Sequence, residues 1–208
     1  MSQKKIVTID YGMGNLWSVQ SAVRYLGRQS LLSSDPDQVR EANFLILPGV
    51  GSFRKAMETL RRTRLEQAIL EAVKVRGAKI LGICLGMQLL GASGSEDGKT
   101  KGLGLISNAV DKFSPQELNR NKIPHVGFNT VHFAKCSGLF RSLPPAADFY
   151  FVHSYRMLGA ELKGNWGTCN YGTEFLAAFE VNNICGTQFH PEKSQTNGLI
   201  LLGNFLEI

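Results

Sequence analysis

The sequence predicts an α/β fold in which a doubly wound sheet, mostly parallel, is covered by helices. Its first half alternates short apolar runs with amphipathic stretches of helical length, which is typical of parallel strands joined by helical crossovers. Its second half is rich in short β-type runs joined by Gly, Pro and Asn turns, which predicts a partly antiparallel extension. With 208 residues, 43% of them hydrophobic, the chain fits one domain over residues 1–208.

In the first half, buried strands are predicted at residues 5–9, 44–47 and 78–83, and helices at residues 16–26 and 65–75. Connections between parallel strands require crossovers of about this length. Asp35-Pro36 is a start signal for a short helix. Gly27 and Gly77 follow helical stretches, at positions where a left-handed cap is often needed.

In the second half, β-type segments are predicted at residues 126–133, 148–152, 167–170, 175–180 and 184–188, followed by a helix at residues 199–206. Residues 91–104 combine Gly, Ser and charged side chains, which favours a surface loop. We find no internal repeat that would require a second domain.

Composition excludes several classes of protein. No run of about 18 apolar residues and no signal peptide is present, so we expect neither a membrane span nor export, and predict a cytoplasmic protein. The cysteines show no metal-type spacing, so we expect free thiols and no metal site. The net charge is +6, but acidic residues interleave with the basic cluster at residues 54–64, which favours a solvated helix face over a nucleic-acid site.

The most informative segment surrounds Cys84, between a predicted buried strand and an apolar helical run. Gly82 and Gly86 flank it in a Gly-x-Cys-x-Gly pattern, which is typical of a nucleophile on a strained strand-to-helix turn. The amide groups at the start of the helix favour the thiolate, and the N–H of Leu85 could hold a developing oxyanion. The alternative is a buried structural cysteine, as we expect for Cys136, Cys169 and Cys185.

A thiolate nucleophile requires a base and a group that orients the base. Pro191 favours an extended backbone at His190, and in an extended chain the side chains of His190 and Glu192 face the same side. Glu192 could then fix the tautomer of the imidazole, which gives a Cys-His-Glu set. The other histidines have a structural role by default, although His153 is followed by Ser154 and Tyr155, two polar side chains that could line a site.

Two glycine-bearing loops follow predicted strands. Gly49-Val50-Gly51 could bring backbone amides close to a ligand or a developing negative charge, but it lacks the ending of a phosphate-binding loop. Gly12-Met13-Gly14 resembles the start of a dinucleotide fingerprint, yet Trp17 stands where the third glycine should be. Nucleotide binding is therefore not predicted there.

Taken in order, these motifs resemble the class I (triad) glutamine amidotransferases, and most closely those that serve as the glutaminase subunit of imidazole glycerol phosphate synthase. The matching segments are residues 10–15, 47–51, 82–88, 124–129, 150–155 and 188–194. The resemblance implies a flavodoxin-like fold and a reaction in which Cys84 attacks the side-chain amide of glutamine, with His190 moving the protons and Glu192 orienting it. It implies no cofactor. It places Gly49, Val50 and Gly51 in an oxyanion strand and Gln88, Glu96, Ser154 and Tyr155 around the substrate.

The same resemblance implies a heterodimer with a (βα)₈-barrel cyclase subunit, to which the ammonia passes in histidine biosynthesis. Asn15 and Lys193 would then lie at the interface, and Tyr150 near the ammonia exit. A paralogue that supplies ammonia for amination of surface-polysaccharide sugars is the main alternative. A free-standing γ-glutamyl peptidase and a scaffold without catalysis are further hypotheses from other classes.

Overall fold

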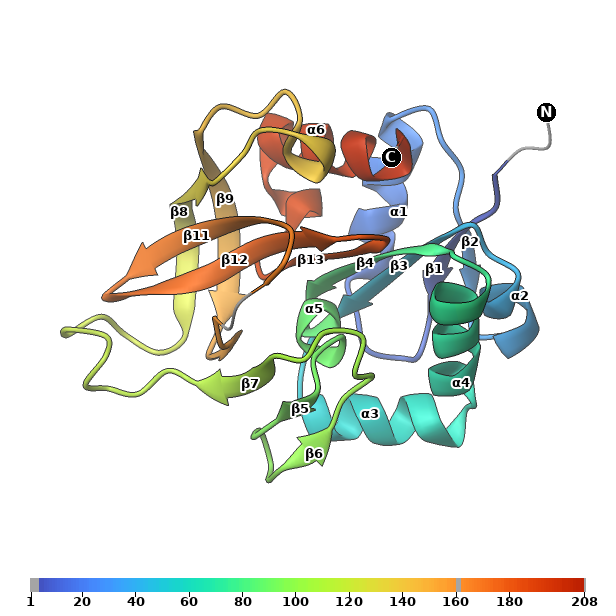
Figure 1. Ribbon diagram of the computed structural model, residues 1–208, viewed down its shortest axis with the longest axis horizontal. Helices are drawn as coiled ribbons and strands as arrows, with labels where there is room; N and C mark the ends of the chain where they lie inside the picture. The colour runs from blue at the N-terminus through green and yellow to red at the C-terminus, as the bar shows by residue number, and fades with distance from the viewer. Residues whose placement is uncertain (1–3, 160–161, 208) are drawn as a thin grey trace.

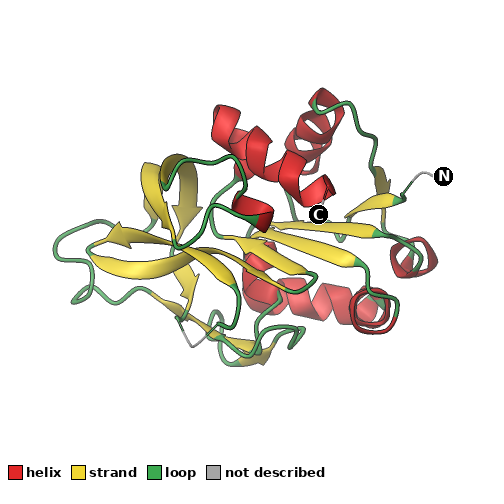
Figure 2. Cartoon of the chain, turned by 45° about the horizontal axis from the view of Figure 1, so that its top comes forward, coloured by secondary structure: helices red, strands yellow, loops and turns green. Residues whose placement is uncertain are grey.

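The computed structural model describes residues 4–159 and 162–207 and shows a layered α/β arrangement built on one large sheet (Figures 1 and 2). Nine strands form this sheet, and each is hydrogen-bonded to the next. From one edge to the other they are β2 (Leu31–Ser33), β1 (Ile6–Ile9), β3 (Phe44–Gly49), β4 (Lys79–Cys84), β13 (Ile184–Thr187), β12 (Thr173–Val181), β11 (Asn165–Tyr171), β8 (His125–Phe133) and β9 (Ala146–His153).

The sheet is mixed, as predicted. Strands β2, β1, β3, β4 and β13 run parallel to one another, whereas β12, β11, β8 and β9 each pair antiparallel with the strand before them in the sheet. Since β13 returns beside β4, the carboxyl ends of two strands distant in sequence lie next to each other at the centre of the sheet. In open α/β sheets, ligands bind outside such carboxyl ends.

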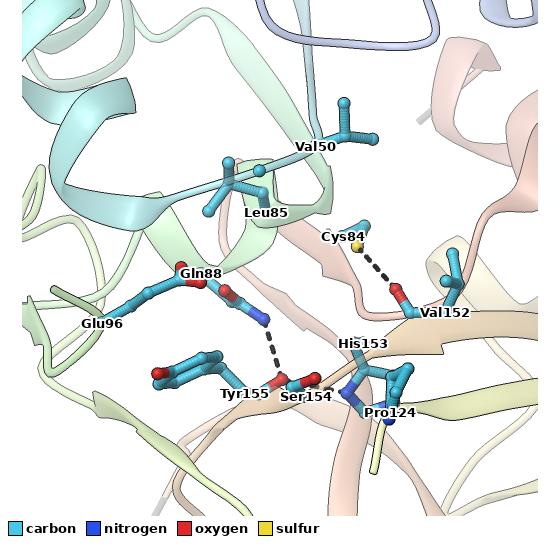
Figure 3. A pocket seen from close by; sticks show the side chains of 11 residues that line it. Val50, Cys84, Leu85, Gln88, Glu96, Pro124, Val152, His153, Ser154 and Tyr155 are labelled. Atoms are coloured by element: carbon cyan, nitrogen blue, oxygen red, sulfur yellow. Dashed lines mark hydrogen bonds between the residues drawn. The ribbon is translucent and has the colours of Figure 1, made fainter.

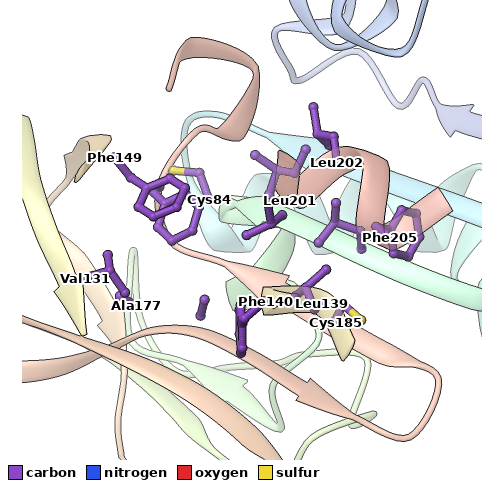
Figure 4. Close-up of a cluster of buried hydrophobic side chains, with 14 of the residues drawn as sticks. Cys84, Val131, Leu139, Phe140, Phe149, Ala177, Cys185, Leu201, Leu202 and Phe205 are labelled. Carbon is purple, nitrogen blue, oxygen red and sulfur yellow. The ribbon is translucent and has the colours of Figure 1, made fainter. Parts of the chain in front are cut away.

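Helices cover both faces of the parallel half. One face carries α1 (Leu16–Tyr25) and α6 (Gln195–Glu207), and the other carries α2 (Pro36–Arg40), α3 (Phe53–Arg62), α4 (Leu65–Leu70) and α5 (Leu85–Leu89). Alternate residues of the strands therefore enter two separate cores: Phe44 and Ile46 pack with the first group, Leu45 and Leu47 with the second. Figure 4 shows part of the first core, where Leu201 and Phe205 of α6 lie against the sheet.

The residues at which the helices begin and end agree with the local sequence signals. The Asp35 side chain accepts a hydrogen bond from the amide of Asp37, with Pro36 at the first helical position. Gly27 and Gly77 both have a φ of +71°, which confirms the expected left-handed caps. In the described residues, none of the helices combines the length and apolar character needed to cross a bilayer.

Two expectations need correction. Residues 91–104 are not wholly a loop, because β5 (Ser93–Gly94) and β6 (Thr100–Lys101) join β7 (Ala109–Lys112) and β10 (Tyr155–Met157) in a second, four-stranded sheet. Strands of two residues with glycine and charged side chains give no alternation by which to recognise them. The predicted helix at 65–75 is α4 followed by a π-helical turn, η1 (Glu71–Val75).

Gly198 of α6 allows this helix to approach the 3₁₀ turn η3 (Pro191–Lys193). A Cβ atom there would lie 1.8 Å from the carbonyl oxygen of Pro191, whereas one on Gly203 of the same helix would have its nearest neighbour at 3.9 Å. Gly198→Ala is therefore expected to lower the free energy of unfolding by about 2 kcal/mol or more, and Gly203→Ala to leave it unchanged or raise it by about 0.5–1 kcal/mol. Urea denaturation measures both, and equal effects would contradict this close packing.

Candidate active site

Cys84 ends β4 at a sharp turn into α5. Its backbone has a φ of +55° and a ψ of −110°, a conformation that is strained for a residue with a side chain. The flanking glycines are required by space, since a Cβ on Gly82 would lie 2.6 Å from the amide nitrogen of Met87, and one on Gly86 1.7 Å from the carbonyl oxygen of Leu47. The strand-to-helix turn predicted from the Gly-x-Cys-x-Gly pattern is present.

His190 reaches Cys84 because β13 lies beside β4. Thr187 is paired with Ile83, so the chain that follows β13 passes next to the turn at Cys84. His190 is extended, with a φ of −95° and a ψ of 97°, and its Nδ1 atom lies 2.8 Å from Oε1 of Glu192. Both side chains are almost completely buried. The sequence-predicted orientation of Glu192 toward His190 is therefore confirmed.

Backbone and serine contacts fasten the His190 loop to β9. The amide of His190 donates to the carbonyl of Tyr150 at 2.9 Å. The hydroxyl of Ser194 donates to the carbonyl of His190 at 2.6 Å and accepts from the amide of Tyr150 at 3.0 Å. The imidazole is thus held on a loop with little freedom to move away from Cys84.

The imidazole of His190 favours its charged form. Burial lowers its pKa, but the closeness of Cys84, the hydrogen bond to Glu192 and the negative charges of both groups outweigh this and raise the pKa to about 10. Nδ1 is hydrogen-bonded to Glu192. The other ring nitrogen, Nε2, is buried and has no hydrogen-bond partner among the described residues. Nε2 is consequently the ring atom available to exchange a proton with Cys84 and with a bound molecule.

A cavity of about 290 Å³ opens beside the sulfur of Cys84 (Figure 3). It has the volume for a molecule of amino-acid size and combines apolar walls with a few polar groups, as small-molecule sites do. Most of its lining consists of residues that the sequence predicts for the nucleophile and the substrate site: Val50, Gly51, Cys84, Leu85, Gln88, Glu96, Ser154 and Tyr155. Pro124, Val152 and His153 complete the wall.

Glu96 supplies the carboxylate of this cavity. Its Oε2 atom accepts the amide hydrogen of Phe53 at 2.9 Å, which ties it to the start of α3. Burial raises its pKa, and this exceeds the opposing effect of that hydrogen bond. The carboxylate is therefore partly desolvated and fixed in direction, which suits it to a positively charged group of a ligand.

The loop Gly49-Val50-Gly51 lies across from the nucleophile. Gly49 ends β3 and pairs with Cys84 in the sheet, and a Cβ on Gly49 would lie 2.4 Å from the buried hydroxyl of Tyr11. Val50 and Gly51 line the cavity, whereas Gly49 itself does not. The loop thus starts beside Cys84 and continues along the wall of the same cavity.

Sequence reasoning missed Gln188. Its fully buried side chain donates from Nε2 to the sulfur of Cys84 at 3.7 Å and accepts from Nε2 of Gln88 at 3.0 Å. The position of Gln188 could have indicated this contact. Gln188 follows Thr187, and because Thr187 pairs with Ile83, Gln188 lies level with Cys84. That register is known only once β13 is assigned as the neighbour of β4.

Asn15, Tyr150 and Lys193 lie outside the cavity. Asn15 precedes α1, and both α1 and β9 contact the turn η3 that contains Lys193. The Lys193 ammonium lies over the ring of Tyr150, 5.8 Å from its centroid. In the ranges that the structure describes, no group of three or more His, Cys, Asp or Glu side chains is arranged to hold a metal ion.

Comparison with known proteins gives one family and a set of similar chains. The model of the class-I glutamine amidotransferase family matches residues 7–207. The chain is 46% identical to imidazole glycerol phosphate synthase subunit HisH 1 of Parasynechococcus marenigrum (strain WH8102), over 97% of both chains. It is 44% identical to imidazole glycerol phosphate synthase subunit HisH of Moorella thermoacetica, over 99% of this chain and 95% of the relative.

Solved structures agree on the fold. The structure of PurLQS from Thermotoga maritima superimposes with a TM-score of 0.74 at 17% identity, covering 99% of this chain and 98% of that chain. A glutamine amidotransferase from the same organism gives a TM-score of 0.66 at 14% identity, covering 100% and 98%.

Proposed function

The chain belongs to the class-I glutamine amidotransferases, and we propose that it is the glutaminase subunit of an imidazole glycerol phosphate synthase, with Cys84, His190 and Glu192 as its catalytic residues. The observation that carries the assignment of these residues is the strained turn at Cys84, placed beside a buried His190–Glu192 pair and an amino-acid-sized cavity. The family model spans nearly the whole chain, which supports one domain over residues 1–208.

In the proposed reaction, the Cys84 thiolate attacks the side-chain amide carbon of glutamine and forms a tetrahedral intermediate. Its negative oxygen is held by the N–H of Leu85, which has no acceptor within its helix, and by a backbone N–H of Gly49-Val50-Gly51. His190 gives its Nε2 proton to the leaving nitrogen, so that ammonia departs and a glutamyl thioester remains. His190 then takes a proton from the attacking water, and collapse of the second tetrahedral intermediate releases glutamate, whose new carboxyl group gives its proton to solvent, and restores the Cys84 thiolate beside the charged His190.

The cavity supports glutamine as the substrate. The fixed, partly desolvated carboxylate of Glu96 can pair with the α-ammonium group, and the backbone and side chains of Gln88, Ser154 and Tyr155 offer polar partners to the rest of the molecule. The amide carbon would lie at the Cys84 end of the cavity. In this orientation the α-ammonium group is bound by Glu96 at the end of the cavity away from the nucleophile.

An exposed apolar face supports docking of a partner over the site. Phe128 and Val126 of β8 lie opposite Tyr150 and Val152 of β9, and side chains two apart on a strand share one face. Val126 and Phe128 are more than half exposed, and Val152 also lines the cavity. An apolar patch that continues into an active site marks an interaction surface. We assign it, with Asn15, Tyr150 and Lys193, to the (βα)₈-barrel cyclase subunit that receives the ammonia.

This proposal places the chain in histidine biosynthesis, in a cytoplasmic heterodimer. The names of the relatives favour that assignment over the sugar-aminating paralogue. The exposed apolar face beside the cavity speaks against a free-standing γ-glutamyl peptidase, which would need no such surface. The geometry of the Cys-His-Glu set speaks against a scaffold that has lost catalysis.

The test is glutamate release from glutamine by the purified chain, alone and with the cyclase encoded in the same genome plus a nucleotide ligand of that cyclase. We expect slow release by the chain alone and stimulation of about 100-fold or more in the complex, because closing the site excludes water and orders its donors. Absence of stimulation, with the complex shown to form, would contradict the assignment to this synthase.

A further inference from the structure

A buried histidine pair that the proposed mechanism does not use begins at the cavity wall with His153 and extends away from the cavity to His125. His125 and His153 are opposite one another on β8 and β9, and both are almost inaccessible to solvent. Nδ1 of His125 lies 3.1 Å from Nε2 of His153. Two imidazoles in such contact can form a hydrogen bond only if one donates and the other accepts.

The neighbouring groups fix the direction of this hydrogen bond. Nδ1 of His153 lies 2.9 Å from the carbonyl oxygen of Tyr155, and because a carbonyl only accepts, Nδ1 must carry the hydrogen. In a neutral ring, Nε2 of His153 then accepts from Nδ1 of His125. Nε2 of His125 is left as an acceptor, and Nδ2 of Asn129 lies 3.5 Å from it. The chain of donors therefore runs from Asn129 through both imidazoles to Tyr155.

The surroundings hold both rings neutral and in place. His125 is stacked between Phe151 and Tyr171, with ring centroids 4.7 and 3.9 Å away. Burial lowers the pKa of His125 to about 4. Burial, together with the positive charges of His125, His190 and Arg156, lowers the pKa of His153 to about 3, although its hydrogen bond to the Tyr155 carbonyl opposes this shift. An added proton on either ring would also place two donors face to face.

The carbonyl of Tyr155, at which this series of hydrogen bonds ends, also contacts a residue of the cavity wall. It accepts a second hydrogen bond from Nε2 of Gln88 at 2.9 Å, and Nε2 of Gln88 also donates to Oε1 of Gln188. Figure 3 shows Gln88, His153 and Tyr155 converging at this point. Gln88, Ser154 and Tyr155 all line the cavity, so the position of this carbonyl sets the shape of the wall.

Resting on the proposed function, we propose that His125 and His153 are positioning residues for glutamine. As a neutral, Nδ1-protonated pair they fix the carbonyl of Tyr155 and, through it, the amide of Gln88 in the geometry that binds the substrate. They act through Tyr155 and Gln88 and exchange no proton with the substrate. Their loss should therefore weaken substrate binding more than it slows the chemical step.

The kinetic test uses the complex with the cyclase. His153→Leu is expected to raise KM for glutamine about tenfold while kcat changes by less than about threefold, since the hydrogen bonds to Tyr155 and His125 are both lost and the carbonyl is left free to move. The side-chain amide of His153→Asn can replace Nδ1 as the donor to Tyr155 and should restore KM to within about threefold of the wild-type value. His125→Leu, which frees the tautomer of His153, should raise KM less than His153→Leu does.

A matched control is available on the same strand. His132 is exposed on β8 and takes no part in the series of hydrogen bonds from Asn129 to Tyr155, so His132→Leu should leave KM and kcat unchanged. A lower melting temperature of His153→Leu with unchanged KM, or a KM that His153→Asn does not restore, would overturn the positioning role.

The tautomers can be measured in the wild-type chain independently of its activity. Long-range ¹H–¹⁵N correlation spectra should show both imidazoles neutral and protonated on Nδ1, without titration between pH 5 and pH 9. An Nε2-protonated ring, or titration of either ring within that range, would refute the pair even if the glutaminase assay succeeds. Conversely, both rings in the expected tautomer with no glutaminase activity in the complex would count against the proposed function and not against the pair.

Discussion

Replacement of Cys84 by alanine or serine is expected to abolish glutamine hydrolysis, with a loss in kcat of about 10⁴-fold or more, because no other group in the cavity can form the thioester. The same variants should leave the reaction of the partner with added ammonia intact, since that reaction requires only a folded and docked chain. Glutamate release and ammonia-dependent turnover by one preparation of the complex measure both effects.

Cys185 provides the matched control for this experiment. It is a second buried cysteine, located on β13 beside β4, and burial raises the pKa of its thiol. Cys185→Ala should retain glutamine hydrolysis even if it lowers stability through the small cavity it creates. Loss of ammonia-dependent turnover in Cys84→Ala, with binding of the partner unaffected, would refute the separation of the two reactions.

The parallel half of the fold could be predicted because its signals are local. The apolar runs at residues 5–9 and 78–83 are buried on both faces of the sheet and carry little polar interruption, so the pattern alone identifies them. The turn at Cys84 is equally recognisable, since only glycine fits at positions 82 and 86. Steric demands of this kind leave a direct trace in the sequence.

The buried polar contacts could not be predicted because they depend on the register of distant strands. Gln188 reaches the sulfur of Cys84 only because β13 lies beside β4, and His125 reaches His153 only because β8 and β9 pair as they do. A polar residue in an apolar run signals that a partner exists but does not identify it. The sequence alone therefore predicts His153 as structural by default, and its hydrogen bond to Tyr155 is evident only from the structure.

His190→Ala is expected to lower kcat for glutamine hydrolysis by about 10⁴-fold, and Glu192→Gln is expected to lower it by about 10³-fold or less. The reason is that a proton carrier contributes more than the group that orients it. Glutamine at position 192 can still accept a hydrogen bond from Nδ1 of His190, which lies 2.8 Å from the present carboxylate, but it carries no charge. Steady-state rates of the two complexes decide the order, and a larger loss in Glu192→Gln would refute the assignment of roles.

The pH dependence of stability separates these roles further. Because folding raises the pKa of His190 from 6.5 to about 10, the folded chain holds a proton there that the unfolded chain releases as the pH rises above 6.5. The resulting stabilisation is fully present below pH 6.5 and is lost as the pH rises through about 10. Glu192→Gln removes one of the charges that raise this pKa, so its melting temperature should start to fall at the same pH of about 6.5, but the fall should be smaller in total and end at a lower pH than in the wild type. Coincident profiles between pH 7 and pH 10.5 would mean that Glu192 does not hold the charge of His190, and the orienting role would then rest on geometry alone.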